Sequence, residues 1–433
     1  MKIALSQFEI IPSMPSDNAA RIINYIEEAK NNKADMIIFP ELAISGYLIG
    51  DMWESESFIR ECEELGEEII KASKDIFVIF GNVAVDRNKK NFDGRVRKYN
   101  ALFLAKDGKL IKNPYSKIPY PFIIKTLLPN YKEFEDPRHF FSLKDLIFEN
   151  ALEDNFDLKE YFNPVEININ GEKINLGLTI CEDAWSSNYN LSPMDILNES
   201  GNVDVFINIS SSPYTLIKDD KRHKMYSDIA KKYNKPLIYV NNVGIQNNGK
   251  TVYTFDGGSS AYDNNGNIIC ASNRYEERLY YIEMNLTKKE FPKAIKINEE
   301  NEYKLIYDTI IYGIRKFMKS IGINKVVIGV SGGIDSALSS AMYVSAIGKD
   351  NVLLVNMPSK FNSNTTKKLA KTLAENLGCA YMVVPIQESV DFTIKQIETC
   401  KIIKDGEESF LKVSSFIAEN IQARDRSSRI LSG

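Results

Sequence analysis

Three side chains in the first half of the chain have types that could together break an amide bond. Glu41 stands in FPELAISGY, Lys125 begins KTLLPNY, and Cys181 stands in TICEDAW. A thiol is mostly protonated at neutral pH and needs an activating partner. A carboxylate can accept the thiol proton, and an ammonium can stabilise the thiolate and the oxyanion that forms next. On residue types alone, a cysteine after an apolar strand is more often a small buried hydrophobe.

Histidine is scarce, which limits how the cysteine could be activated. The chain has two histidines, His139 and His223, and neither stands in a recognisable Cys–His hydrolase context. Histidine is the usual base for such a thiol and the commonest metal ligand. The sequence therefore favours activation by a carboxylate and a lysine, and it argues against a His-rich metal site. Lys117 competes with Lys125 for the lysine position.

A glycine-rich loop in the second half has the composition of a phosphate-binding site. The loop SGGIDS follows an apolar run and opens a predicted helix. Gly332 and Gly333 let backbone amides approach phosphate oxygens, and Ser331 and Ser336 add hydroxyl donors at the positive end of the helix. Asp335 would repel bare phosphate, so we expect it to hold Mg²⁺. The alternative is a Gly-Gly turn with a helix cap. No Gly-Lys-Ser/Thr follows, so the loop is not a Walker A motif.

Length and composition favour a protein of two domains. A chain of 433 residues is long for one domain. A net charge of −4 argues against a general nucleic-acid surface. No apolar run reaches the ~18 residues of a membrane span, and the N-terminus lacks the apolar core of a signal peptide. Five cysteines without a CxxC pair favour a reducing cytoplasm.

Apolar patterning predicts an α/β fold for both domains. In the first domain, near-continuous apolar runs predict strands at 2–10, 35–40, 76–81, 100–105, 176–180, 205–209, 237–241 and 279–284, with helices at 16–32 and 58–72. In the second, strands at 325–330 and 351–356, and a possible third near 381–384, alternate with helices at 303–320, 336–347 and 364–377. This alternation predicts the start of a doubly wound parallel sheet. We expect domains at 1–285 and 304–433 and a charged linker at 286–303.

The ordered motifs around Glu41, Lys125 and Cys181 resemble the nitrilase, or carbon–nitrogen hydrolase, superfamily. More narrowly, FPELAISGYLIGD, KTLLPNY, TICEDAW and NISSSPYTLIK look like the glutaminase domain of glutamine-dependent NAD synthetases. The resemblance covers residues 1 to about 285. It implies an αββα sandwich with Glu41 as general base, Lys125 as oxyanion-stabilising cation and Cys181 as nucleophile.

The same resemblance implies a glutamine pocket, although the chain departs from the family in places. The implied glutamine contacts are Tyr47, near the mouth, and Tyr131, Glu182, Ser212 and Lys218. The family usually has Glu where this chain has Asp136, with Glu135 just before it, and either carboxylate could take that role. Lys218 would bind as a point charge. Residues 142–162 form a longer segment than the family needs, which we expect to be a helical excursion.

SGGIDS resembles the PP-loop ATP pyrophosphatases, which cleave ATP to AMP and pyrophosphate while adenylating a carboxylate or carbonyl. A nitrilase-type glutaminase upstream distinguishes NAD synthetase from GMP and asparagine synthetases in that superfamily. The resemblance implies ATP contacts from Ser331, Gly332, Gly333, Asp335, Ser336 and Met357. In the ENIQAR segment, Asn420 and Arg424 would face deamido-NAD, and Glu419 would help Asp335 bind Mg²⁺. A solvated amphipathic face is the alternative for this segment.

Together these features predict a glutamine-hydrolysing NAD synthase with glutamine, ATP·Mg²⁺ and deamido-NAD as substrates. We expect a cytoplasmic protein that binds neither nucleic acid nor membrane and is a homo-oligomer in its full-length form. The resemblance implies a synthetase domain that continues beyond Gly433, so we expect this PP-loop domain to be partial and poor at making NAD. One alternative is a nitrilase-type amidase with a vestigial nucleotide domain. Another is a nucleotide-sensing protein without catalysis.

Overall fold

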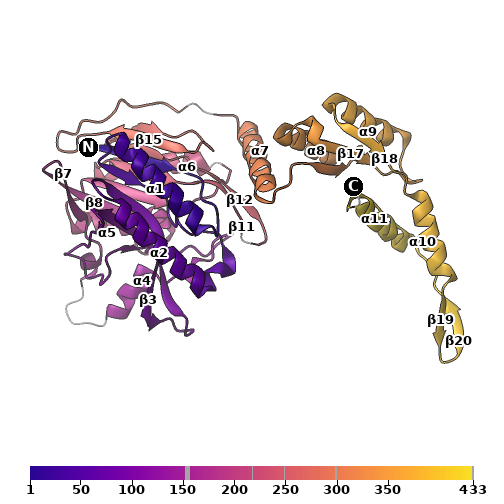
Figure 1. Cartoon of the computed structure of the whole chain (residues 1–433), viewed down its shortest axis with the longest axis horizontal. Coiled ribbons are helices and arrows are strands. Elements are labelled where there is room, and N and C mark those ends of the chain that lie inside the picture. Colours follow the sequence, from indigo (N-terminus) through magenta and orange to yellow (C-terminus); the bar gives the residue numbers. More distant parts are fainter. Residues whose placement is uncertain (152–156, 217, 248, 298–299, 432–433) are drawn as a thin grey trace. The chain divides into compact units, whose positions relative to one another are not determined.

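The computed structural model describes residues 1–151, 157–216, 218–247, 249–297 and 300–431, without the side chains of residues 218, 219 and 431. The chain forms two compact units, Met1–Thr309 and Ile310–Gly433 (Figure 1). The linker expected at 286–303 includes residues 298–299, which lie outside the described residues, and this boundary stays a prediction. The helices in the described part of the chain lack the combined length and hydropathy of a membrane-spanning segment.

Two mixed sheets form the centre of the first unit. The first sheet has the order β15-β1-β2-β3-β4-β5, with β6 paired to β4, and the second has the order β14-β13-β10-β9-β8-β7. The strands of the first are β1 (Lys2–Gln7), β2 (Met36–Ile38), β3 (Phe77–Lys90), β4 (Val96–Lys106), β5 (Lys109–Leu110), β6 (Ile123–Ile124) and β15 (Arg278–Glu283). Those of the second are β7 (Val165–Ile169), β8 (Glu172–Ile180), β9 (Val205–Ser210), β10 (Leu237–Asn241), β13 (Ser260–Tyr262) and β14 (Ile268–Ala271). A separate hairpin joins β11 (Val243–Asn247) and β12 (Val252–Asp256).

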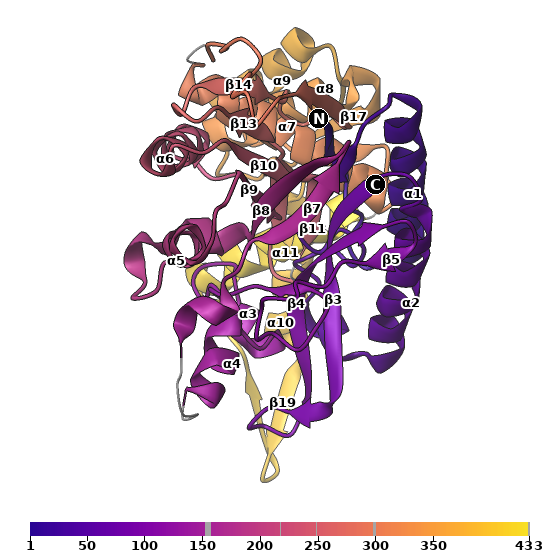
Figure 2. The same cartoon turned by 90° about the vertical axis from the view of Figure 1, so that its left-hand side faces the viewer.

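Strand pleating divides the apolar side chains between three cores. On β1, Ile3 and Leu5 join the core between the sheets, whereas Ala4 joins the core under α1 (Pro15–Asn31) and α2 (Glu56–Ala72). A third core joins the second sheet to α5 (Pro193–Ser200) and α6 (Lys218–Tyr233). Figure 2 shows the two helix pairs on opposite sides of the sheets. The predicted αββα sandwich is confirmed.

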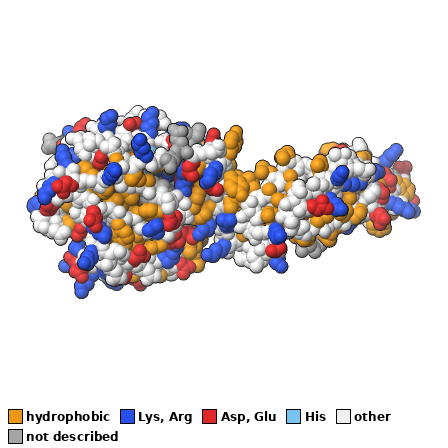
Figure 3. Space-filling model, turned by 90° about the horizontal axis from the view of Figure 1, so that it is seen from above, with side chains coloured by type: hydrophobic (Ala, Val, Ile, Leu, Met, Phe, Trp, Pro, Cys, Tyr) orange, Lys and Arg blue, Asp and Glu red, His pale blue; other side chains and the backbone are white. Residues whose placement is uncertain are grey.

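Short helices and turns connect the strands of the first unit. They include α3 (Asp136–His139) and α4 (Leu143–Asn150), and short 3₁₀ turns at Gly50–Glu54, Leu158–Tyr161, Cys181–Ala184 and Ser186–Asn188. Helix α4 and the Leu158–Tyr161 turn lie in the excursion expected at 142–162, of which residues 152–156 lie outside the described residues. On the face shown in Figure 3, basic and acidic side chains are interspersed over the first unit.

The second unit contains a parallel sheet of order β16-β17-β18, with strands Val326–Gly329, Val352–Asn356 and Ala380–Val383. One core joins this sheet to α8 (Ile334–Ile347) and α9 (Asn364–Leu377), and another joins it to α10 (Gln387–Thr399) and α11 (Ser415–Leu431). A hairpin of β19 (Lys401–Lys404) and β20 (Glu407–Phe410) separates α10 from α11, and α7 (Glu302–Ser320) spans the boundary between the units. The doubly wound parallel sheet predicted from the sequence is confirmed.

Candidate active site

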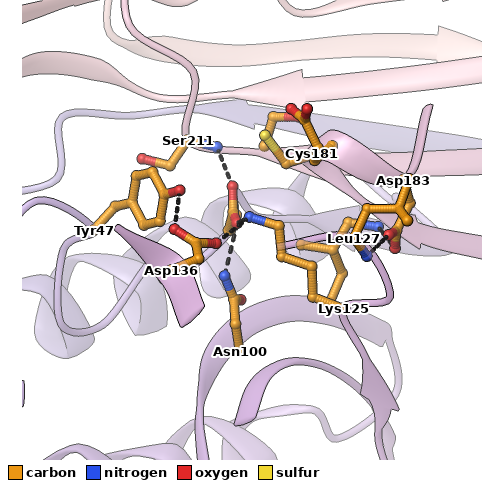
Figure 4. Close-up of polar contacts among 12 residues, drawn as sticks. Tyr47, Asn100, Lys125, Leu127, Asp136, Cys181, Asp183 and Ser211 are labelled. Atoms are coloured by element: carbon orange, nitrogen blue, oxygen red, sulfur yellow. Dashed lines mark hydrogen bonds and ion pairs between the residues drawn. The ribbon is translucent and has the colours of Figure 1, made fainter. Parts of the chain in front are cut away.

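Glu41 lies three residues after β2 and is completely buried. Its Oε1 accepts hydrogen bonds from Lys125 Nζ (2.7 Å) and from Asn100 Nδ2 on β4 (2.7 Å). Its Oε2 accepts the backbone N–H of Ser211, the residue that follows β9 (2.8 Å). Figure 4 shows these contacts converging from both sheets. A carboxylate held by three donors has a fixed position from which to exchange a proton.

Gly81 on β3 makes room for the segment that carries Glu41. A Cβ on Gly81 would lie 2.6 Å from Glu41 Cα and 2.4 Å from Leu42 N. The Gly81 backbone also donates to Pro40 O (3.1 Å) and accepts from Ala43 N–H (2.9 Å). Any larger residue at Gly81 would therefore displace the backbone of Glu41.

Lys125 follows β6 and is also completely buried. Its Nζ donates to Glu41 Oε1 (2.7 Å) and to Asp136 Oδ2 (2.8 Å). Burial acts to lower the pKa of Lys125, but attraction to Asp136, Glu41 and Cys181 outweighs it and holds the pKa well above its usual value. The ammonium therefore stays charged at neutral pH.

Lys117, the competing lysine, lies elsewhere. Its ammonium forms a partly exposed ion pair with Glu160 (2.8 Å). The structure thus brings Lys125, and not Lys117, to Glu41.

Asp136, at the start of α3, is the carboxylate that meets Lys125. Its Oδ1 accepts the hydroxyl of the buried Tyr47, while Glu135 instead pairs with Arg138 (3.3 Å). Burial raises the pKa of Asp136, Lys125 opposes that rise, and Glu41 adds to it. Burial and the nearby acidic groups also raise the pKa of Tyr47, which keeps its phenol protonated as a donor.

Cys181 comes directly after β8 and begins the Cys181–Ala184 turn with a φ of +46°. Positive φ is uncommon outside glycine and is typical of strained functional positions. The side chain is 6% exposed and interacts electrostatically with Lys125 and Tyr47. In Figure 4 the Cys181 sulfur lies on the side of the Lys125 ammonium, to which Glu41 is bound. The structure therefore brings the three predicted catalytic residues together in one buried cluster.

Two tyrosines hold Glu182 next to Cys181. Tyr131 OH lies 3.1 and 3.2 Å from the two Glu182 carboxylate oxygens, and Tyr189 OH donates to Oε1 (2.9 Å). Glu182 is buried, whereas Tyr131 is 47% exposed at the edge of the cluster. Burial and the Glu182 charge raise the pKa of Tyr131, so its hydroxyl remains a donor. The arrangement presents a fixed negative charge beside the thiol.

The other predicted pocket residues follow β9. Ser212 is buried, and its backbone N–H donates to Asn241 Oδ1 (2.8 Å). Lys218 begins α6, but its side chain lies outside the described part of the structure.

The SGGIDS loop of the second unit borders a cavity of about 660 Å³ between β16, β17 and α11. Ser331 and Met357 line it, together with Arg426 and Ser427 of α11. Gly332 has a φ of +86°, and a Cβ there would lie 2.3 Å from Thr366 O.

The loop is also held by its own hydrogen bonds. Gly333 N–H donates to Ser331 Oγ (3.2 Å), and Ser336 Oγ donates to Gly333 O (3.0 Å). Asp335 is exposed in the first turn of α8.

Helix α11 presents Glu419, Asn420 and Arg424 to solvent. No group of three or more His, Cys, Asp or Glu within the described ranges is arranged to hold a metal ion. Asp335 and Glu419 therefore form no preassembled metal cage there. Because Mg²⁺ is usually held by one or two carboxylates together with substrate phosphates, an exposed Asp335 beside the loop still fits that mode.

The carbon-nitrogen hydrolase family matches residues 2–289, which is most of the chain. The chain belongs to the carbon–nitrogen hydrolase family. A second family, NAD synthase, matches residues 306–431. Both halves of the resemblance stated from the motifs are thus confirmed.

Known relatives align with most of this chain. The glutamine-dependent NAD(+) synthetase of Synechocystis sp. is 29% identical over 395 residues, covering 89% of this chain and 64% of the relative. That of Acinetobacter baylyi is 30% identical over 391 residues, covering 90% and 64%. The chain thus spans slightly less than two thirds of the length of these two relatives. A glutamine-dependent NAD+ synthetase from Acinetobacter baumannii, solved with ADP, is similar in structure (TM-score 0.79, 27% identity), covering 100% of this chain and 72% of that one.

Several contacts of the two sites were not predicted from the sequence. Asn100, Tyr189 and the Ser211 N–H reach the site from separate segments, and Arg426 reaches the second cavity. TICEDAW does contain Asp183, but nothing in that motif indicates its partners. Arg426 lies two residues beyond the ENIQAR segment, so helical spacing was the one available hint.

Proposed function

We propose that this chain is a glutamine-hydrolysing NAD synthase, in which the first unit releases ammonia from glutamine and the second uses ATP to amidate deamido-NAD. The observation that carries the proposal is the buried Glu41–Lys125–Asp136 cluster beside Cys181. It supplies a base, a permanent cation and a thiol without histidine. Names of the relatives supply the class of substrate.

In the first reaction, Glu41 accepts the Cys181 proton as the sulfur attacks the glutamine amide carbon. The carbonyl oxygen gains negative charge, which the Lys125 ammonium stabilises. The tetrahedral intermediate collapses, the C–N bond breaks, and Glu41 returns the proton to the departing ammonia. Glu41 then removes a proton from water, and the oxygen attacks the thioester carbon. The C–S bond breaks, glutamate leaves, and Glu41 returns the proton to the Cys181 sulfur.

Asp136 acts through Lys125 in this scheme. Its carboxylate and the Tyr47 hydroxyl fix the ammonium on the side of Glu41. The Glu182 carboxylate, held by Tyr131 and Tyr189, is suited to bind the α-ammonium group of glutamine.

In the second reaction, the SGGIDS amides and hydroxyls hold ATP phosphates as the nicotinate carboxylate of deamido-NAD attacks the α-phosphorus. Pyrophosphate leaves, and ammonia then displaces AMP from the acyl adenylate to give NAD. Asp335, exposed in the first turn of α8, would help hold Mg²⁺ together with the phosphates, and the ion would supply positive charge opposite the pyrophosphate. Roles for Glu419, Asn420 and Arg424 remain proposals, as do the cytoplasmic setting and the homo-oligomeric full-length form.

The deciding experiment measures glutamate and NAD separately. Glutamate release from glutamine, with and without ATP and deamido-NAD, tests the first unit. NAD formation with glutamine or ammonium as donor tests the second. Glutamate release at a rate that does not respond to ATP or deamido-NAD would favour the stand-alone amidase. ATP binding without thiol-dependent hydrolysis would favour a nucleotide sensor.

A further inference from the structure

Asp183 has a set of contacts that the proposed reaction does not use. Its side chain is almost completely buried, two residues after Cys181. Oδ1 accepts the backbone N–H groups of Thr126 (3.0 Å) and Leu127 (2.8 Å), and Oδ2 accepts that of Ile180 (3.2 Å). Figure 4 shows the carboxylate against the backbone that follows Lys125.

The three donors belong to the two segments that carry the chemistry. Thr126 and Leu127 come directly after Lys125, and Ile180 comes directly before Cys181. One carboxylate therefore joins the loop that carries the cation to the strand end that carries the thiol. An ordinary helix cap would satisfy only donors of its own turn.

The bond to Ile180 also supports the unusual backbone at the nucleophile. Cys181 has a φ of +46° between Ile180 and Asp183. Such a conformation persists only where surrounding contacts determine it. The Asp183 carboxylate reaches back across Cys181 to the preceding N–H and closes this turn.

The contacts of Asp183 argue against a role as acid or base, because both carboxylate oxygens are held by backbone N–H groups, although a pKa near neutrality alone would suit proton transfer. Burial raises its pKa to about 7, while the backbone donors and the nearby Lys125 oppose the rise. Its described polar contacts are to backbone N–H groups, so its effect on the reaction would pass through the geometry of its neighbours.

We propose that Asp183 is a positioning residue that sets the distance and orientation between the Cys181 thiol and the Lys125 ammonium. This inference rests on the proposed glutaminase reaction. Small displacements of reacting groups, of about 1 Å, can lower rates ~10²-fold. Substrate affinity depends instead on groups such as Glu182, so the effect should fall on kcat rather than on KM.

The test compares Asp183→Asn with Asp204→Asn. Asparagine keeps the shape of Asp183 but has a single acceptor oxygen, so either the Thr126–Leu127 pair or Ile180 loses its acceptor. Asp204 is the matched control, because its carboxylate accepts the backbone N–H of Asn175 (2.8 Å) on the same strand β8, away from Cys181. Circular dichroism at the assay temperature establishes that each variant is folded.

We expect Asp183→Asn to lower kcat for glutamine hydrolysis about 10²-fold with KM within about threefold, and Asp204→Asn to leave both within about twofold. Alkylation of Cys181 by iodoacetamide, followed by peptide mass spectrometry without substrate, should slow at least about tenfold in Asp183→Asn alone. If the wild-type chain hydrolyses no glutamine, the proposed function fails and the alkylation rate still decides the role of Asp183.

An unchanged kcat, or a loss confined to KM, would overturn the proposal. So would an equal loss in the Asp204 control. If Asp183→Asn does not fold, Asp183→Glu replaces it. That variant keeps both oxygens but displaces them by one methylene, and we expect a kcat about tenfold lower with KM retained. An unchanged kcat in Asp183→Glu, or failure of both variants to fold, would show a role in general stability and refute the positioning role.

Discussion

Removal of the Lys125 ammonium is the most direct perturbation of the buried charge cluster. Lys125→Ala would leave Glu41 and Asp136 as neighbouring buried carboxylates without their shared cation. Breaking a buried pair by removing one partner typically costs ~3–5 kcal/mol. Loss of a single oxyanion donor lowers kcat ~10²–10³-fold. Because Lys125 would also stabilise the Cys181 thiolate, we expect Lys125→Ala to lower kcat for glutamate release by more than ~10³-fold.

Stability and activity of the first unit can be measured separately from the second. Both tryptophans, Trp53 and Trp185, lie within Met1–Thr309, so tryptophan fluorescence reports its unfolding alone. With an m value of ~3 kcal/mol/M, a loss of ~3–5 kcal/mol would lower the urea midpoint by ~1–2 M. The rate of glutamate release, measured without urea at a temperature where the variant stays folded, gives kcat.

Two further variants control this measurement. Lys117→Ala removes a partly exposed ion pair, which is worth ~0–1 kcal/mol, and should change neither kcat nor the midpoint appreciably. Lys125→Met restores most of the lost volume without charge, so a similar loss in Lys125→Met and Lys125→Ala assigns the effect to charge. A Lys125→Ala enzyme within ~10-fold of wild type, or a Lys117→Ala enzyme equally impaired, would refute the reasoning.

Four other substitutions, one of them with a matched control, test the remaining parts of the two sites. Cys181→Ala should abolish glutamate release while ammonium-supported NAD synthesis, where the chain has any, persists; substantial glutamine turnover would remove Cys181 as nucleophile. Asp136→Asn should lower kcat for glutamate release ~10²-fold because it loses charge at Lys125, whereas Glu135→Gln should leave it unchanged; equal effects would reopen the choice between them. Asp335→Ala should weaken ATP binding in a calorimetric magnesium titration, and magnesium-independent affinity in the wild-type chain would contradict that role. Gly332→Ala should lower ATP affinity more than ~10-fold, because the backbone φ is +86° and the new Cβ would collide with the backbone of Thr366. Glutamate release should stay at the wild-type rate. Normal ATP binding by this variant would exclude the loop from the nucleotide site.

Periodicity in the sequence located the buried elements well. The strand predicted at 237–241 and the helix predicted at 364–377 have the same bounds in the structure, because each is limited by an abrupt change in polarity or by a cap. Strands β3 and β4 extend further than predicted, to Lys90 and from Val96. Their outer ends are stabilised by hydrogen bonds between the two strands. The side chains there are mostly polar, so the alternation of apolar and polar residues that predicts a strand is missing.

The residue types of the candidate site were predictable from the sequence, but their hydrogen-bond partners were not. The order of the motifs identified Glu41, Lys125 and Cys181 as candidate catalytic residues, and the structure places them together. Asp136 and Glu135 are adjacent in sequence, and only the start of α3 decides that the first points inward and the second to solvent. Contacts from Asn100 and the Ser211 N–H depend on how two sheets meet, which local patterning does not record.

Shared burial of one cation among several acidic groups explains how such a site can operate without histidine. Before the reaction, Lys125 contacts two carboxylates and interacts with the Cys181 thiol. When the thiol proton moves to Glu41 in the proposed reaction, negative charge moves from carboxylate to sulfur, and the net charge of the cluster does not change. When sulfur attacks, the charge moves on to the substrate oxygen. At each stage the negative charge lies near the same ammonium, and Asp136 keeps that ammonium protonated and in place. Transfer of charge inside a fixed electrostatic environment requires little reorganisation, which is the condition for a low barrier.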